Sequence, residues 1–172
     1  MEFGDRESFA IQIELDSDHG GSWLYGRFCY WINGKQVGDY DLGTSLRDVL
    51  FNMKGIMGDS GNRDGGSLCA LSPEEAFLVL DKSLYGDGGK PQAIQLPDTP
   101  ARFDISPPVD VFDHWKMYLI SCGDRDLLLY KHSSHTDVQV FSTSVGMFDR
   151  IVRAAYNHLD TLYEKQTGQR VS

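Results

Sequence analysis

Residues Ser22–Leu42, S-W-L-Y-G-R-F-C-Y-W-I-N-G-K-Q-V-G-D-Y-D-L, decide the fold that this sequence predicts. Aromatic and aliphatic side chains crowd the first part of the stretch, and Asn33-Gly34 then interrupts the run. Asn-Gly between two strand-like segments is the strongest short-range signal for a β-hairpin, because both residues tolerate the positive φ of a type I′ turn. The sequence therefore predicts a hairpin with Trp23–Ile32 as its long arm and Gln36–Leu42 as its short arm.

The turn also determines which side chains of the hairpin share a face, because a two-residue turn sets the pairing of the arms. Phe28 and Tyr30 are then expected on one face, beside the carboxylates of Asp39 and Asp41. The expected pairs are Ile32 with Lys35, Tyr30 with Val37, Phe28 with Asp39, and Gly26 with Asp41. The opposite face would carry Trp23, Tyr25, Cys29, Trp31, Tyr40 and Leu42, with Arg27 among them. A three-residue loop would shift the short arm by one position and dissolve this arrangement.

The segment Ser8–Leu15 alternates apolar residues with polar or small ones, and this period of two is typical of an antiparallel strand with one buried face. The turn at 16–21, D-S-D-H-G-G, leads from this strand into the long arm of the hairpin. If the apolar side of the strand lies on the tryptophan side of the hairpin, Gln12 and Glu14 join Phe28 and Tyr30 on the other face. That face would be aromatic in the middle and acidic at its margin.

Capping signals and apolar stripes predict three helices. Thr44-Ser45 with Asp48 resembles a capping box before a helix that frays at residues 55–58. Ser72-Pro73, followed by two glutamates, begins a second helix, which Gly86 ends. The last helix has Thr143 or Ser144 as its cap, and its apolar stripe contains Val145, Phe148, Val152, Ala155, Leu159 and Leu162.

The rest of the chain predicts extended structure. Five of the six prolines lie between Tyr85 and His114, which excludes a helix there and leaves only short edge strands such as Arg102–Ile105. Three strand-like runs then form a meander: Trp115–Ser121, Asp126–Lys131 and Val138–Ser142. The sequence thus predicts an α+β fold in one domain spanning residues 1–172. An N-terminal three-stranded meander and a C-terminal meander, both antiparallel, would carry about three helices packed on one face.

Composition limits the classes of function. A formal net charge of −9 argues against nucleic-acid binding, because phosphate contacts need clustered Lys and Arg. The acidic balance favours a basic partner through electrostatic steering, although many cytosolic proteins are acidic for solubility alone. No apolar run approaches the roughly 18 residues of a membrane span, so no membrane association is expected. The first residues lack the basic and apolar regions of a signal peptide.

The three cysteines, Cys29, Cys69 and Cys122, are too few and too scattered to predict a disulfide framework. Cys29 and Cys122 lie in strand-like apolar runs, where a free cysteine behaves as a small buried hydrophobic residue. A reduced, cytoplasmic protein is therefore expected.

The sequence contains no convincing catalytic or metal-binding motif, so no enzyme activity, cofactor or metal is expected. His132 and His135 have a spacing that metals sometimes use, but a loop between two strands explains them better. His114 precedes a strand, and no nucleophile is placed near it by the sequence. The glycine-rich stretch 58–67 lacks the Gly-Lys-Ser/Thr end of a phosphate loop. It is interpreted as a mobile surface loop that a partner could order.

Asp39 and Asp41 are the clearest candidates for a binding surface. On one face of a strand their carboxylates would lie about 6–7 Å apart. That spacing suits acid–base chemistry as well as binding. Two exposed acids at alternate positions are most often only a solvated face; a basic binding partner is the main functional alternative, and catalysis a lesser one.

Several stretches of the chain resemble an immunity-protein family of bacterial polymorphic toxin and contact-dependent inhibition systems (family forty-two). They are Phe3-Gly4-Asp5 before Ser8-Phe9-Ala10-Ile11, the aromatic run Trp23–Trp31, Asn33-Gly34, and V-G-D-Y-D-L at 37–42. The resemblance spans most of the chain and is densest near its N-terminus. It implies an α+β protein that binds the C-terminal toxin domain of its own or a sibling strain in the cytoplasm and blocks it. Many such toxins are basic nucleases, to which an acidic inhibitor would be steered.

The residues expected to contact the toxin are Glu14, Phe28, Tyr30, Asp39, Asp41, Asp59 and Asp64, the last two from the stretch 58–67. The exposed aromatic side chains could equally form the interface of a homodimer, which is an alternative to toxin binding. Two further hypotheses remain: a small cytoplasmic hydrolase that uses His114 or His132 with nearby carboxylates, and a non-catalytic adaptor module. A large secreted protein encoded by the neighbouring gene would favour the immunity protein over both.

Overall fold

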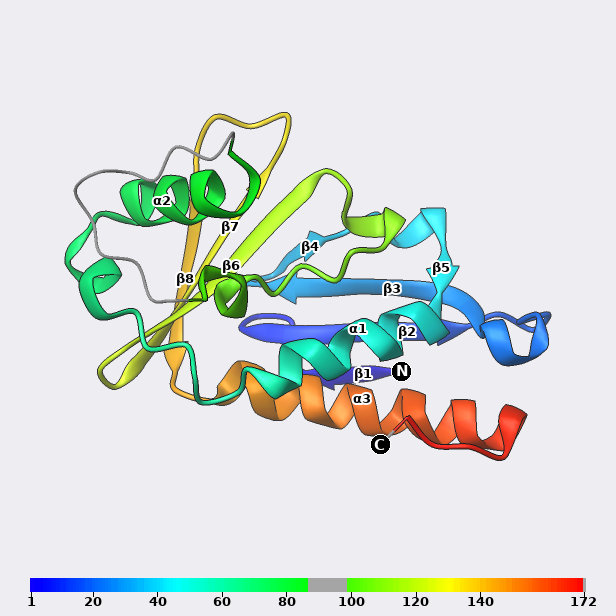
Figure 1. Cartoon of the computed structure of the whole chain (residues 1–172). Helices are drawn as coiled ribbons and strands as arrows, with labels where there is room; N and C mark the ends of the chain where they lie inside the picture. The colour runs from blue at the N-terminus through cyan, green and yellow to red at the C-terminus, as the bar shows by residue number, and fades with distance from the viewer. Residues whose placement is uncertain (87–98, 172) are drawn as a thin grey trace. The chain divides into compact units, whose positions relative to one another are not determined.

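The computed structural model describes residues 1–86 and 99–171, which form an α+β fold in two compact units (Figure 1). The first unit comprises Met1–Gly58, Pro107–His114 and Met147–Ser172, and the second comprises Asp59–Ser106 and Trp115–Gly146. Each unit contains its own antiparallel sheet, and the α-helices of the described residues are divided between the units. The predicted fold class is confirmed, whereas the single domain over residues 1–172 stays a prediction.

A five-stranded antiparallel sheet forms the frame of the first unit, in the order β1-β2-β3-β4 with β5 also paired to β3. The strands are β1 (Glu2–Gly4), β2 (Phe9–Leu15), β3 (Tyr25–Ile32), β4 (Lys35–Val37) and β5 (Thr44–Ser45). The long aromatic arm of the predicted hairpin is therefore the central strand, β3. The short strands β1 and β5 extend the three-stranded meander that the sequence predicts.

The helices α1 (Leu46–Gly58) and α3 (Met147–Thr167) pack on each other and on β1, β2 and β3. Phe28 and Tyr30 of β3 lie opposite Ile13 and Ile11 of β2, and directly opposite residues share a face of an antiparallel pair. All four side chains are buried. The ring of Tyr30 lies 5.0 Å from that of Phe112 between centroids. This is the core of the first unit.

The predicted assignment of faces was wrong. Gln12 and Glu14 lie opposite Cys29 and Arg27, so they share a face with the Trp31 side of β3 and not with Phe28 and Tyr30. The cause is pairing: β2 aligns its apolar residues with the even-numbered residues of β3, and these become the buried side. Phe28 and Tyr30 have no exposed surface and cannot form part of an aromatic binding face.

The hairpin register is confirmed near the turn and fails beyond it. Tyr30 pairs with Val37 and Ile32 with Lys35, as predicted. The short arm then leaves the sheet at Gly38. This residue has φ +103°, and a Cβ added to it would lie 2.9 Å from the ring of Phe112. Because of this, Asp39 is not opposite Phe28, and Gly26 pairs with Thr44 instead of Asp41.

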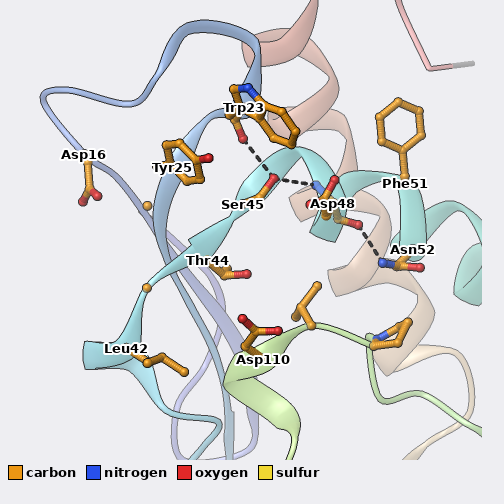
Figure 2. Close-up of a pocket in the computed structure, with 14 residues that line it drawn as sticks. Asp16, Trp23, Tyr25, Leu42, Thr44, Ser45, Asp48, Phe51, Asn52 and Asp110 are labelled. Carbon is orange, nitrogen blue, oxygen red and sulfur yellow. Dashed lines mark hydrogen bonds between the residues drawn. The ribbon is translucent and has the colours of Figure 1, made fainter.

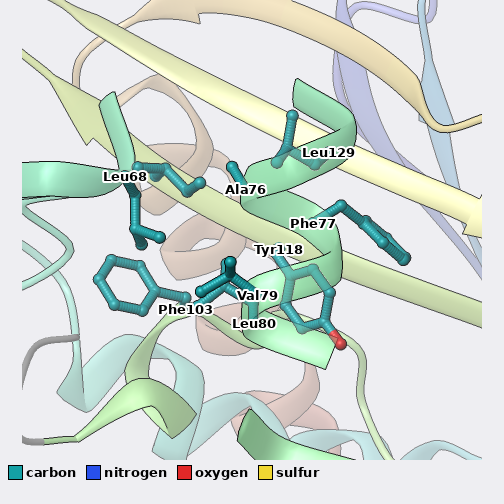
Figure 3. Close-up of a cluster of buried hydrophobic side chains, with 9 residues drawn as sticks. Leu68, Ala76, Phe77, Val79, Leu80, Phe103, Tyr118 and Leu129 are labelled. Carbon is teal, nitrogen blue, oxygen red and sulfur yellow. The ribbon is translucent and has the colours of Figure 1, made fainter. Parts of the chain in front are cut away.

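The second unit follows the predicted C-terminal meander, with β6 (Trp115–Cys122), β7 (Arg125–His132) and β8 (Gln139–Ser144) in that order. Helix α2 (Pro73–Tyr85) begins after the predicted cap Ser72, which forms a capping box with Glu75: each side chain accepts a hydrogen bond from the other residue's backbone N–H. Figure 3 shows the apolar side of α2 on the strands. The buried cluster includes Phe77 and Leu80 of the helix together with Leu68, Phe103, Tyr118 and Leu129.

The stretch 58–67 was predicted to be a mobile loop, and this is wrong for its second half. Arg63 is 1% exposed and donates from Nε to the carbonyl of Arg102 at 2.9 Å. The backbone N–H of Ser121 donates to the carbonyl of Arg63, and the backbone N–H of Gly65 donates to the carbonyl of Ser121. These bonds hold residues 63–65 beside β6.

Cys69 and Cys122 form a disulfide, 53 residues apart in sequence. The expectation that Cys122 is a free buried thiol is therefore wrong; only Cys29 is free, and it is buried. Spacing along the chain could not reveal the pair, because Cys69 is brought to the end of β6 by the bonds between residues 63–65 and Ser121. Reduced surroundings and a cytoplasmic location stay predictions.

The proline-rich segment is partly described. Pro100–Phe103 is a 3₁₀ turn, and the predicted edge strand Arg102–Ile105 is reduced to a single bridge between Asp104 and Tyr118. Pro91 and Pro97 lie outside the described residues. No helix in the described part of the chain is long and apolar enough to span a membrane.

Replacing Gly65 by Ala is expected to destabilise the protein by about 1–3 kcal/mol, because the added Cβ would lie 2.3 Å from the Cγ2 of Ile120. Gly55→Ala is the matched control: that Cβ meets nothing within 4 Å, and Ala is favoured in a helix interior by about 0.5–1 kcal/mol. Urea denaturation followed by circular dichroism measures both. Equal stability of the Gly65→Ala protein and the wild type would contradict this packing.

The disulfide predicts a specific pattern of thiol labelling. The folded, oxidised protein should take up no iodoacetamide, and after dithiothreitol it should be labelled at Cys69 and Cys122. Cys29 should react only on denaturation, since burial raises the pKa of its thiol to about 12. Mass spectrometry counts the labels. Two labels on the oxidised protein would refute the pairing.

The disulfide should also stabilise the folded protein. The double variant C69S/C122S should lower the free energy of unfolding by about 4 kcal/mol.

Candidate functional site

An open pocket of about 730 Å³ lies in the first unit, where the start of β3, β5 and the first turns of α1 meet Pro108–Asp110 (Figure 2). Large apolar side chains line it from several elements: Trp23, Tyr25, Leu42 and Phe51. Carboxylates line it as well, from Asp16, Asp48 and Asp110. Exposed aromatic and apolar side chains that gather in one hollow are typical of binding surfaces.

The local backbone explains why Trp23 and Tyr25 are both exposed. Leu24 adopts a left-handed conformation, φ 52°, directly after the 3₁₀ turn Gly21–Trp23, and its side chain is buried. That reversal leaves the neighbouring rings outside, parallel to within 4° and with centroids 6.2 Å apart. Gly20 is required beneath them, because a Cβ there would lie 2.7 Å from the ring of Tyr25.

The beginning of α1 fixes another wall of the pocket. Ser45 accepts a hydrogen bond from the backbone N–H of Asp48 and donates to the carbonyl of Trp23, at 3.2 and 3.1 Å. The amide of Asn52 donates to the carbonyl of Asp48 at 2.9 Å. The predicted helix cap is thereby confirmed at Ser45, and it also ties the helix to the Trp23 turn.

Arg47 contacts two of the residues that line the pocket, Trp23 and Asp48. The guanidinium carbon of Arg47 lies 3.6 Å from the ring centroid of Trp23. Its Nε and Nη2 donate to one carboxylate oxygen of Asp48, at 3.0 and 2.9 Å. Within residues 1–86 and 99–171, no ion pair engages the carboxylate of Asp16 or Asp110.

The sheet face opposite the helices carries a polar network. The hydroxyl of Tyr40 donates to Glu14 at 2.8 Å and accepts from the amide of Gln12 at 3.0 Å. The oxygen of Gln12 accepts in turn from the indole N–H of Trp31 at 2.9 Å. Arg6 stacks on Trp31, with 4.3 Å from its guanidinium carbon to the ring centroid. Burial, assisted by the hydrogen bond to Glu14 and its charge, raises the pKa of Tyr40 to about 12.

The structure brings together only some of the predicted site residues. Glu14, Asp39 and Asp41 are exposed. Tyr40, which lies between the two aspartates in sequence, brings this segment to Glu14 through its hydrogen bond. Phe28 and Tyr30 are buried in the core, which excludes them from a surface. Asp59 is half-buried and Asp64 is exposed, both in the second unit. A toxin-binding role for Glu14, Asp39, Asp41, Asp59 and Asp64 stays a prediction.

The sequence did not predict the pocket, because Trp23 and Tyr25 were expected on the face opposite the predicted binding face. Two signals were present: Gly20-Gly21 before Trp23 permits the left-handed turn, and Ser45-Asp48 marks a helix start. Neither signal reveals that these segments lie side by side. Leu42, at the end of the 3₁₀ turn Tyr40–Leu42, joins the pocket to the predicted Asp39–Asp41 segment.

No histidine is among the described residues that line the pocket. The Nδ1 of His132 lies 2.6 Å from the hydroxyl of Ser134, and its ring packs edge-on against Trp115 at 4.8 Å between centroids. Among the described residues, no group of three or more His, Cys, Asp or Glu side chains is arranged to hold a metal ion. The described lining of the pocket offers hydroxyls and carboxylates.

Comparisons with known proteins agree with one another. A family model described as "Immunity protein 42" matches residues 1–158. Among solved structures, the chain is similar to the "Crystal structure of CdiI from Burkholderia dolosa AUO158", with 17% sequence identity and a TM-score of 0.74. This similarity covers 92% of the present chain and 99% of that chain, so the two share a fold. No curated protein matched.

The network on the open face of the sheet predicts an alkaline transition. The pKa of Tyr40 is raised above its unfolded value near 10, so its stabilising contribution is complete below pH 10 and is lost as the pH rises towards 12. Glu14→Gln removes the negative charge and should lower the pKa of Tyr40. Titration of ¹³C-labelled tyrosine by NMR measures the change, with Tyr40→Phe to assign the signal. An unaltered pKa in Glu14→Gln would contradict the coupling.

Proposed function

Because the chain belongs to the immunity protein 42 family, we propose that it neutralises its cognate toxin by direct contact in the cytoplasm, as a binding protein without catalysis of its own. The match of the family model to residues 1–158 is the observation that carries this proposal. The fold shared with CdiI from Burkholderia dolosa is consistent with this family.

We infer a toxin domain of opposite charge. The chain has a formal net charge of −9, and complementary charge accelerates association and suppresses wrong partners. A nuclease would fit, because an enzyme that holds a nucleic-acid backbone needs a positively charged path. An acidic inhibitor covering that path would exclude the substrate, and its rapid association would limit damage before the complex forms.

Co-expression with the toxin tests this function. The C-terminal domain of the large secreted protein encoded next to this gene is induced in a test bacterium, with and without the chain. We expect growth to be restored and the two proteins to purify together, because neutralisation requires a stable complex. A toxin domain from an unrelated system is the specificity control. A toxic neighbouring domain that the chain neither binds nor neutralises would contradict the proposal for that pair.

A further inference from the structure

We propose that the pocket between β3, β5 and α1 is the docking site for the toxin, and that it takes arginine or lysine side chains of a basic toxin segment. The inference deepens the proposed function and rests on it. It assigns the partner's chemistry and the contact surface, neither of which follows from membership of the family.

The first support is the gathering of exposed aromatic side chains. Trp23, Tyr25 and Phe51 are 44%, 46% and 47% exposed, and Leu42 beside them is 58% exposed. These four are among nine large hydrophobic residues that are exposed in the described part of the chain, and all four line one hollow. Aromatic residues in a hollow are typical anchors of protein interfaces, because they bury large areas while losing little side-chain entropy.

The second support is the charge of the lining. Asp16, Asp48 and Asp110 contribute carboxylates, and no Lys or Arg is among the described lining residues. Figure 2 shows the side chain of Asp110 directed into the hollow, towards Thr44. A cation entering from the partner would therefore meet carboxylates and ring faces together, and this combination binds a guanidinium well.

Arg47 already makes within the chain the kind of contact that is proposed for a cation of the partner. One guanidinium is held both by an indole face at 3.6 Å and by a carboxylate at 2.9 Å. Asp48 is thus already paired, whereas the carboxylates of Asp16 and Asp110 have no ion pair in the described residues. The latter two are the acids available to a partner.

The same charges argue against other occupants. A nucleic acid would bring phosphates against the three carboxylates, which repel them. A second copy of the chain, docked pocket to pocket about a two-fold axis, would place its own Asp16 and Asp110 against the same acids. Like charges juxtaposed in an interface oppose association. A basic protein segment is the occupant that fits both the rings and the acids.

The test measures the affinity of pocket variants for the cognate toxin domain by calorimetry. The double variant Asp16→Asn/Asp110→Asn keeps the size of the side chains and should weaken binding by about tenfold or more. It should also reduce the salt dependence of the association rate. Tyr25→Ala should weaken binding by about tenfold through loss of an aromatic anchor.

Matched controls come from the second unit, where Asp124 and Leu78 are exposed. Asp124→Asn removes the same kind of charge, and Leu78→Ala truncates an exposed apolar side chain. Both should bind as the wild type does, and thermal melting should show that every variant is folded. Wild-type affinity in the pocket variants, or an equal loss in the controls, would overturn the docking site.

The outcomes separate this inference from the function on which it rests. If the wild-type chain neither protects against nor binds the toxin domain, the proposed function fails. If the wild type binds but the folded pocket variants bind equally well, only the docking site fails. Sedimentation of the chain, alone and with the toxin domain, gives a further check. A homodimer that the pocket variants dissociate, and that persists when toxin is bound, would assign the pocket to a second copy and overturn the inference.

Discussion

Burial of Phe28 and Tyr30 is the constraint on which the first unit depends. Their rings contact Phe112, and Tyr30 also meets Phe9 and Phe148, so one strand joins β2, α3 and Pro107–His114 in a single core. Burying an aromatic side chain of this size contributes about 1.5–3 kcal/mol. Because side chains alternate along a strand, this choice sends Arg27, Cys29 and Trp31 to the other face. Glu14 and Tyr40 follow them there.

Much of the fold could be predicted because its signals are local. Asn33-Gly34 predicts the hairpin, Ser45 and Ser72 predict helix starts, and the meander Trp115–Ser144 follows from alternation and turns. The side of β3 that is buried is not a local property, since both sides carry aromatic residues. It is decided by pairing with β2 and by Phe112, which is distant in sequence. The predicted binding face was wrong for this reason, since it contained the buried Phe28 and Tyr30 and left out Trp23 and Tyr25.

In the second unit too, contacts between residues distant in sequence decide a structure that local composition did not predict. Arg63 and Gly65 lie in a glycine-rich stretch whose composition predicts a loop without fixed contacts, yet backbone hydrogen bonds to Ser121 hold it beside β6. A buried arginine can be stable because its guanidinium donates to carbonyls such as that of Arg102. The disulfide between Cys69 and Cys122 lies at the same place. In a reducing compartment the hydrogen bonds would still hold the segment, so the covalent bond reinforces an arrangement that polar contacts already form.

The proposed docking site consists of side chains that the core leaves exposed: aromatic rings and acids at one end of β3. Hydrogen exchange of the chain, free and bound to its toxin domain, tests this most directly. Binding at the pocket should slow exchange of backbone amides in residues 23–26 and 44–48, around Tyr25 and Ser45, with little change in β6, β7 and β8. Protection confined to those strands of the second unit, with none around the pocket, would contradict the account.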